Sequence, residues 1–174
     1  MKIKSSCLFL LFIQALFCNS IAQESVLGYV NPIIGTNGMG HTFPGACSPF
    51  GLIQLSPETD TIPHNVDGKY QTRVYEYCAG YQHNDKTIVG FSHTHLSGTG
   101  HSDLGDILIM PTTGKIHTNP GTAADPDNGY RSRFTHESER CSPGYYEVML
   151  DDYGIKAQLT ATQRVGVHQY TYPS

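Results

Sequence analysis

The chain has 174 residues, 39% of them hydrophobic and 15% charged, with a formal net charge of −4 at pH 7. Without its first 22 residues it keeps nine basic and fifteen acidic residues, a net charge of −6. An acidic chain without a Lys/Arg cluster lacks the basic patch that phosphate contact needs, so nucleic acid is not expected as a partner.

The N-terminus has the pattern of a secretory signal peptide over residues 1–22. Two lysines precede an apolar run at 7–17, and small residues lead to a cleavage site after Ala22. The run is shorter than the roughly 20 apolar residues that span a bilayer, so no transmembrane segment is expected. A lipid anchor on Cys18 is the alternative, but Phe17 stands where such signals have a small residue. We expect export, to the periplasm or the extracellular space.

Residues 23–174 are rich in short strand-like runs separated by turn clusters, and helical periodicity is scarce. The runs lie at 51–56, 87–92, 106–111, 145–150, 155–160 and 165–172, with a short strand expected within 130–136. Residues 151–154 form a hairpin turn, whereas 57–73 and the rest of 114–140 are polar and predicted to be loops. The pattern predicts an all-β fold, an antiparallel β-sandwich.

The strand-like run at 165–172 ends directly before the last two residues. Because no closing helix or polar tail follows, we expect the domain to be truncated at its C-terminal end. Beyond the signal peptide the cysteines are Cys47, Cys78 and Cys141. An odd number predicts at least one free thiol or an intermolecular bridge.

Residues 90–106 combine three histidines, two aspartates and four glycines, so polar side chains converge on a flexible backbone. In an extended segment His93 and His95 point to the same side, a spacing known from metal sites. His101 or Asp103 would supply a third ligand. Alternatively, these side chains order the loop through hydrogen bonds or bind the hydroxyl groups of a sugar.

Two further segments invite a binding role. Tyr75, Tyr77 and Tyr81 have the parity of one strand face, where they form either platforms for sugar rings or the rim of the core. The glycine-rich segment 35–46 lacks the ending of a phosphate loop and is expected to bring its backbone close to a ligand. Glycosidases need two carboxylates, but the sequence marks no pair among Glu58, Asp60, Asp85, Asp103 and Asp106.

Several long motifs, in order, resemble the beginning of glycoside hydrolase family 92, a family of exo-acting α-mannosidases of which many cleave α-1,2 links. They are Val30-Asn31-Pro32-Ile33-Ile34-Gly35-Thr36, His41-Thr42-Phe43-Pro44-Gly45-Ala46, Pro49 to Pro57, Cys78-Ala79-Gly80-Tyr81, Gly90 to Pro111 and Thr160 to His168. The resemblance covers nearly all of the chain after the signal peptide.

The resemblance implies the N-terminal β-sandwich of a longer, secreted enzyme whose C-terminal domain is an (α/α)6 barrel. It implies inverting hydrolysis of a mannose-containing glycan with the help of a calcium ion. The family's acid, base and calcium ligands lie in the barrel, so no catalytic residue and no metal ligand is expected in this chain. Alone, the chain should be inactive and would contribute one wall of the substrate pocket, in contact with its own C-terminal domain.

By the same resemblance, six residues are expected to face the substrate: Tyr77, Cys78, His93, His95, Asp103 and Asp106. In many members a tryptophan precedes the cysteine, and here Tyr77 takes that place. Another departure is the pair at 101–102 before Asp103. Two other functions remain open from the residues alone. One is a stand-alone carbohydrate-binding β-sandwich module, and the other is a metal-binding β domain that uses His93, His95 and His101.

Overall fold

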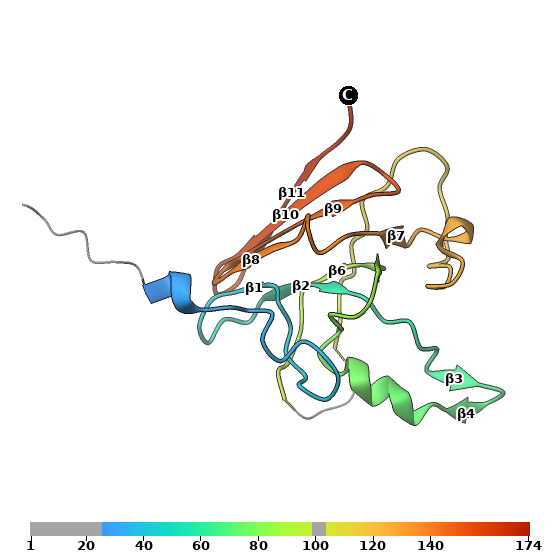
Figure 1. Ribbon diagram of the computed structural model, residues 1–174, viewed down its shortest axis with the longest axis horizontal. Coiled ribbons are helices and arrows are strands. Elements are labelled where there is room, and N and C mark those ends of the chain that lie inside the picture. Colours follow the sequence, from blue (N-terminus) through green and yellow to red (C-terminus); the bar gives the residue numbers. More distant parts are fainter. Residues whose placement is uncertain (1–25, 99–103) are drawn as a thin grey trace, which may run out of the picture.

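The computed structural model describes residues 26–98 and 104–174. Their two larger antiparallel sheets, of four and three strands, pack face to face, and two further antiparallel sheets have two strands each (Figure 1). The signal peptide predicted at 1–22 lies outside the described residues. The strands are β1 (Ala46–Cys47), β2 (Gln54–Glu58), β3 (Asn65–Val66), β4 (Lys69–Tyr70), β5 (Thr87–Ile88), β6 (Gly90–Ser92), β7 (Ser132–Arg133), β8 (Arg140–Ser142), β9 (Tyr145–Leu150), β10 (Ile155–Ala161) and β11 (Gly166–Thr171). The short 3-10 helices are η1 (Val26–Tyr29), η2 (Thr72–Tyr77) and η3 (Pro126–Asn128).

The larger sheet has the order β11-β10-β9-β8 and is built from consecutive hairpins. Buried and partly exposed residues alternate along β9 and over most of β10, as the period of two in a half-buried strand requires. The turn between them pairs Leu150 with Ile155 and uses Gly154, whose φ is +62°. The hairpin predicted at 145–160 is therefore confirmed.

The smaller sheet has the order β1-β2-β6, and its inner face packs against β9 and β10. Leu55 and Phe91 are fully buried there. They join Tyr146, Val148, Leu150, Ile155, Ala157 and Leu159 of the larger sheet in one hydrophobic cluster. The predicted all-β, antiparallel fold is confirmed. No helix in the described part of the chain is long and apolar enough to cross a membrane.

The apolar run at 106–111 does not form the predicted strand. Ile107 has a φ of +57°, and only Ile109 makes a β-bridge, to Phe91. The side chains of Ile107, Leu108 and Ile109 are exposed by 71%, 39% and 37%. A continuous apolar run forms a buried strand only where other elements cover both faces of the sheet. Residues 107–109 are not covered in this way.

Other strand boundaries also differ from the predictions. The predicted strand at 87–92 is divided at Val89, because β5 pairs with β7 and β6 pairs with β2. The segment 57–73, predicted to be a loop, begins inside β2 and contains the β3–β4 hairpin, which projects from the body of the molecule in Figure 1. Tyr75 and Tyr77 lie on η2, so the prediction that they share a strand face is wrong.

Candidate functional site

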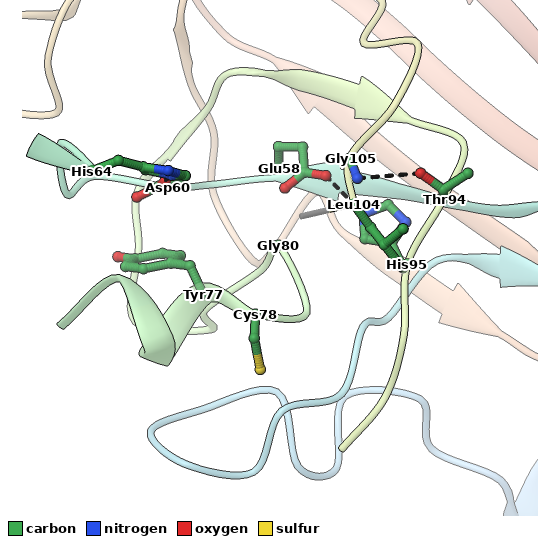
Figure 2. Close-up of a pocket in the computed structure, with 10 residues that line it drawn as sticks. All are labelled: Glu58, Asp60, His64, Tyr77, Cys78, Gly80, Thr94, His95, Leu104 and Gly105. Atoms are coloured by element: carbon green, nitrogen blue, oxygen red, sulfur yellow. Dashed lines mark hydrogen bonds and ion pairs between the residues drawn. The ribbon is translucent and has the colours of Figure 1, made fainter. Parts of the chain in front are cut away.

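A small polar cavity lies where the loops after β2 and β6 meet the end of η2 (Figure 2). Its volume is about 90 Å³. Ten residues line it: Glu58, Asp60, His64, Tyr77, Cys78, Gly80, Thr94, His95, Leu104 and Gly105. In Figure 2, Glu58 stands between Asp60, His64 and Tyr77 on one side and Thr94 and His95 on the other.

The centre of the cavity wall is a histidine–carboxylate pair. His95 Nδ1 lies 2.7 Å from the carbonyl oxygen of Gln54, which only accepts, so Nδ1 carries a hydrogen. His95 Nε2 lies 2.9 Å from Glu58 Oε1 and 3.1 Å from Ser92 Oγ. The hydroxyl of Ser92 donates to the same carboxylate oxygen. With side chains 2% and 15% exposed, His95 and Glu58 form a largely buried pair.

Two glycines give the Glu58 carboxylate its space. Gly80 has a φ of +80°, and a Cβ built on it would overlap with Glu58 Oε2. Gly105 has a φ of +97°, and its Cβ would lie 3.1 Å from Glu58 Oε1. A side chain at either position would strain the backbone and displace the carboxylate. The glycines of these segments thus shape the cavity.

Thr94 and Asp106 join the two arms of the loop that closes the cavity. Thr94 Oγ1 donates to Asp106 Oδ2 at 3.0 Å and accepts from the backbone N–H of Asp106 at 2.9 Å. The backbone N–H of Gly105 donates to the carbonyl oxygen of Thr94 at 2.9 Å, and that of His93 to the carbonyl of Asp106 at 3.0 Å. Asp106 is exposed and braces the loop without lining the cavity.

The opposite wall is built around Tyr77 of η2. Its hydroxyl donates to Asp85 Oδ2 at 2.9 Å and lies 2.7 Å from Thr61 Oγ1, which donates to it. Burial raises the pKa of Tyr77, so the phenol keeps its proton at neutral pH. The hydroxyl is thus occupied by protein groups, and the ring is the part of Tyr77 that remains for a ligand.

A buried arginine lies behind this wall. Arg131 is 5% exposed and donates to the carbonyl oxygen of Asp60 at 2.6 Å and to Thr87 Oγ1 at 2.8 Å. Burial raises the pKa of the Asp60 and Asp85 carboxyls, while the nearby Arg131 charge lowers that of Asp85. Asp60 also accepts from the backbone N–H of Ile62 at 2.8 Å, which fixes its carboxylate at the cavity.

His93 points to other partners than His95 does. Its Nδ1 donates to the carbonyl oxygen of Ile107 at 2.9 Å, so its Nε2 accepts from His168 Nε2 at 3.1 Å. His168 Nδ1 in turn accepts from the hydroxyl of Tyr170 at 2.7 Å. Burial and the neighbouring His93 lower the pKa of His168 to about 4, so the His168 imidazole is neutral at pH 7.

Three of the six residues expected to face a substrate line the cavity, namely Tyr77, Cys78 and His95. Cys78 Sγ also donates to the carbonyl oxygen of Gly98 at 3.4 Å. His93 and Asp106 lie in the surrounding loop but do not line the cavity, and Asp103 lies outside the described residues. Their role as sugar ligands stays a prediction.

Sequence reasoning missed Glu58 and Asp60 as a pair, although both line the cavity. The signal was their spacing, since residues two apart at the end of a strand face the same side. It missed the contribution of His64 and Arg131 as well, because nothing near them in sequence points to this site.

The described residues offer no calcium-like donor set at the cavity. Calcium takes six to eight oxygen ligands. In residues 26–98 and 104–174, the only group of three or more His, Cys, Asp or Glu side chains in close proximity is His83, His136 and Glu139, and two of its three donors are nitrogens. None of the three lines the cavity, so the residues present do not fit a calcium ion.

Comparison with known proteins gives a consistent result. The model of the glycosyl hydrolase family 92 N-terminal domain matches residues 29–174. The chain is 50% identical to the family GH92 α-mannosidase BT3965 of Bacteroides thetaiotaomicron, solved in complex with mannoimidazole, with a TM-score of 0.77 over 86% of this chain and 18% of that one. It is 29% identical to the GH92 family glycosyl hydrolase ccman5, with a TM-score of 0.65 over 86% of this chain and 19% of that one.

A curated relative is an uncharacterized secreted glycosidase of Arthroderma benhamiae, 29% identical over 160 residues. That match covers 87% of this chain and 18% of the relative. The chain therefore spans about a fifth of the length of the proteins it matches.

Proposed function

The chain belongs to glycosyl hydrolase family 92, and from this membership we propose that it is the N-terminal part of a secreted, calcium-dependent, inverting exo-α-mannosidase. The cavity around Glu58, Asp60 and His95 forms one wall of its sugar site. The observation that carries the proposal is the 50% identity to a family GH92 α-mannosidase solved with mannoimidazole, together with a polar cavity built from the shared domain.

The size of the cavity fits one wall of a sugar-binding site better than a complete sugar-binding site. A volume of about 90 Å³ is well below the roughly 300–1,000 Å³ of pockets that enclose a whole small-molecule ligand. One or two hydroxyl groups of a hexose enter such a space, and the ring itself needs another surface. In the proposed role, Asp60 accepts hydrogen bonds from these hydroxyls and His64 donates to them. The ring of Tyr77 offers an apolar face to the sugar.

The bond-breaking groups are assigned to the remaining four-fifths of the family length. An inverting glycosidase places an acid and a base about 6.5–9.5 Å apart on either side of the scissile bond. In this chain Glu58 Oε1 is occupied by Ser92 and His95, so Glu58 acts as a positioning residue for the cavity wall. Calcium, which the described residues do not fit, is assigned to the same downstream part.

Exposed apolar side chains support contact with that downstream part, the protein's own C-terminal domain. Leu96 and Leu104 are exposed by 60% and 40% and flank the described arms of the cavity loop, and Ile107 is exposed by 71%. Clusters of exposed apolar side chains mark interaction sites in soluble proteins. A catalytic domain seated on them would close the cavity and bring the acid and base to the sugar.

The proposed substrate is a mannose-containing glycan, with α-1,2 as the proposed linkage. Tyr77 is the residue of this chain that bears on linkage, because its ring is part of the wall and its position holds a tryptophan in many family members. The smaller ring leaves more room for the sugar on the leaving side.

The test compares two proteins. The full gene product is assayed for release of mannose from an aryl α-mannoside and from α-1,2-mannobiose, with calcium and with a chelator. The 174-residue chain is assayed in parallel. We expect calcium-dependent turnover with inversion by the full product and none by the chain. Turnover by the chain alone, or a stop codon directly after Ser174, would reject the proposal, and the stop codon would favour a stand-alone carbohydrate-binding module.

A further inference from the structure

A second group of polar side chains lies apart from the sugar cavity. It consists of His83, which precedes β5, and of His136 and Glu139, which lie between β7 and β8. One potential ligand atom from each side chain lies within 4.8 Å of the other two. The two imidazole rings stack with their centroids 4.0 Å apart. Segments more than 50 positions apart in sequence thus place three metal-binding side chain types together.

The Glu139 carboxylate is already fixed in position. Its side chain is only 3% exposed. Tyr81 donates to both carboxylate oxygens at 3.0 Å, and Tyr146 donates to Oε1 at 2.7 Å. Burial raises the pKa of both tyrosines, so they remain donors. Metal-ligating carboxylates are held by outer hydrogen bonds in this way.

The two histidines are arranged for ligation too. His136 Nδ1 lies 2.8 Å from Glu139 Oε2, so this nitrogen and this carboxylate can approach one cation together.

We propose that His83, His136 and Glu139 form a binding site for a divalent transition-metal cation, with zinc as the best match. Two imidazole nitrogens and one carboxylate oxygen are a donor set that zinc accepts and calcium does not favour. Bonds of about 2.0 Å place tetrahedral ligands about 3.3 Å apart. The three ligand atoms lie within 4.8 Å of one another, so binding would draw them closer together. The fourth position stays open to water or to a further ligand.

A cation bound there would link the segment before β5 to the segment before β8. Because it binds the folded chain and not the unfolded one, it would raise the melting temperature with increasing metal concentration. This proposal does not depend on the glycosidase function, since none of the three residues lines the sugar cavity.

The experiment titrates the metal-free full chain with Co²⁺ and then Zn²⁺, in a Cys47→Ser background because Cys47 is an exposed thiol that would compete. We expect one equivalent of Co²⁺ with the visible absorption of four-coordinate cobalt, displaced by Zn²⁺ and not by Ca²⁺. His83→Ala and Glu139→Gln should each weaken binding about 10-fold or more. His117→Ala, a histidine outside both sites, should leave it unchanged.

Circular dichroism of each variant without metal identifies those that fail to fold, and His83→Ala is the variant least exposed to this problem because its ring is only half-buried. Absence of stoichiometric binding to the folded chain would overturn the proposal. So would binding that survives His83→Ala and Glu139→Gln but is lost in His93→Ala, which would move the metal to the histidines of residues 90–106.

Discussion

Two largely buried histidine–carboxylate pairs occupy different regions of this molecule, one at the sugar cavity and one between β7 and β8. His95 and Glu58 are 2.9 Å apart, and His136 and Glu139 are 2.8 Å apart. The first carboxylate receives a serine hydroxyl and lies between two glycines, next to an open cavity. The second receives two tyrosine hydroxyls and is nearly sealed from solvent.

The difference shows how the residues around a histidine–carboxylate pair decide what the pair does. Glycines leave the Glu58 carboxylate accessible along one side, so its pair can shape a surface that meets a ligand. Bulky tyrosines enclose Glu139, so its pair joins segments of the sandwich. When a buried carboxylate is removed, its hydrogen-bond partners stay buried without an acceptor, which lowers the free energy of unfolding. This loss should be larger for the more enclosed pair.

The largest effect is expected from Glu139→Ala. The change leaves His136 Nδ1 and the hydroxyls of Tyr81 and Tyr146 without their acceptor, in a buried place. We expect a loss of about 3–5 kcal/mol in the free energy of unfolding, measured by urea denaturation of the metal-free chain. Glu137→Ala is the control, since Glu137 is exposed, and it should change stability by less than about 0.5 kcal/mol. Equal effects of the two changes would contradict the comparison.

Gly80→Ala should have the second-largest effect on stability, and it tests whether the Glu58 carboxylate needs the space that Gly80 leaves. The left-handed backbone costs about 1–2 kcal/mol for alanine, and the overlap with Glu58 adds about 1–3 kcal/mol. Gly68→Ala supplies the matched control, because Gly68 has a similar φ of +75° with nothing within 4 Å of its Cβ. The difference between the two melting curves isolates the overlap with the carboxylate. If Gly68→Ala destabilises as much, the overlap is not the cause.

Glu58→Gln changes the charge of the cavity pair and keeps its shape. The amide still accepts from Ser92, but the charged hydrogen bond to His95 is lost, at about 1.5–3 kcal/mol. Because Glu58 positions the wall, kcat/KM of the full gene product for an aryl α-mannoside should fall about tenfold or more, which corresponds to about 1.4 kcal/mol. Steady-state kinetics measures this, and wild-type activity in a folded variant would remove Glu58 from the site.

Asp106→Ala is expected to have the smallest effect. Asp106 is exposed and accepts one side-chain hydrogen bond from Thr94, worth about 0.5–1.5 kcal/mol. The loop should open locally, so hydrogen exchange at the amides of Gly105 and Asp106 should accelerate while the global melting temperature changes little. Unchanged exchange at these amides would show that the other hydrogen bonds of the loop suffice.

The parts of the fold that follow from local pattern were predictable from the sequence. The alternation in β9 and β10 and the turn at 151–154 identified the hairpin, because neighbouring residues decide it. The strand predicted at 106–111 was wrong, because apolar residues of this run stay exposed and Ile107 takes a left-handed backbone conformation. Tyr75 and Tyr77 misled for another reason, because a 3-10 turn and a strand were not separable by parity over so few residues.

The site was predictable in part. His95, Tyr77 and Cys78 lie in segments whose composition drew attention, and all three line the cavity. Glu58 and Arg131 were not recognised, because their roles depend on partners 37 and 71 positions away in the chain. Such long-range contacts leave no periodic trace in the sequence.

The hydrogen bond between His93 and His168 joins residues 75 positions apart and has a consequence for biosynthesis. A chain is made from its N-terminus at about 5–20 residues per second. The arm of the loop that carries His93 therefore emerges several seconds before β11 can hold it. During that interval His93 lacks this partner, and the hydrogen bond that joins the loop to β11 can form only after residue 168 has left the ribosome.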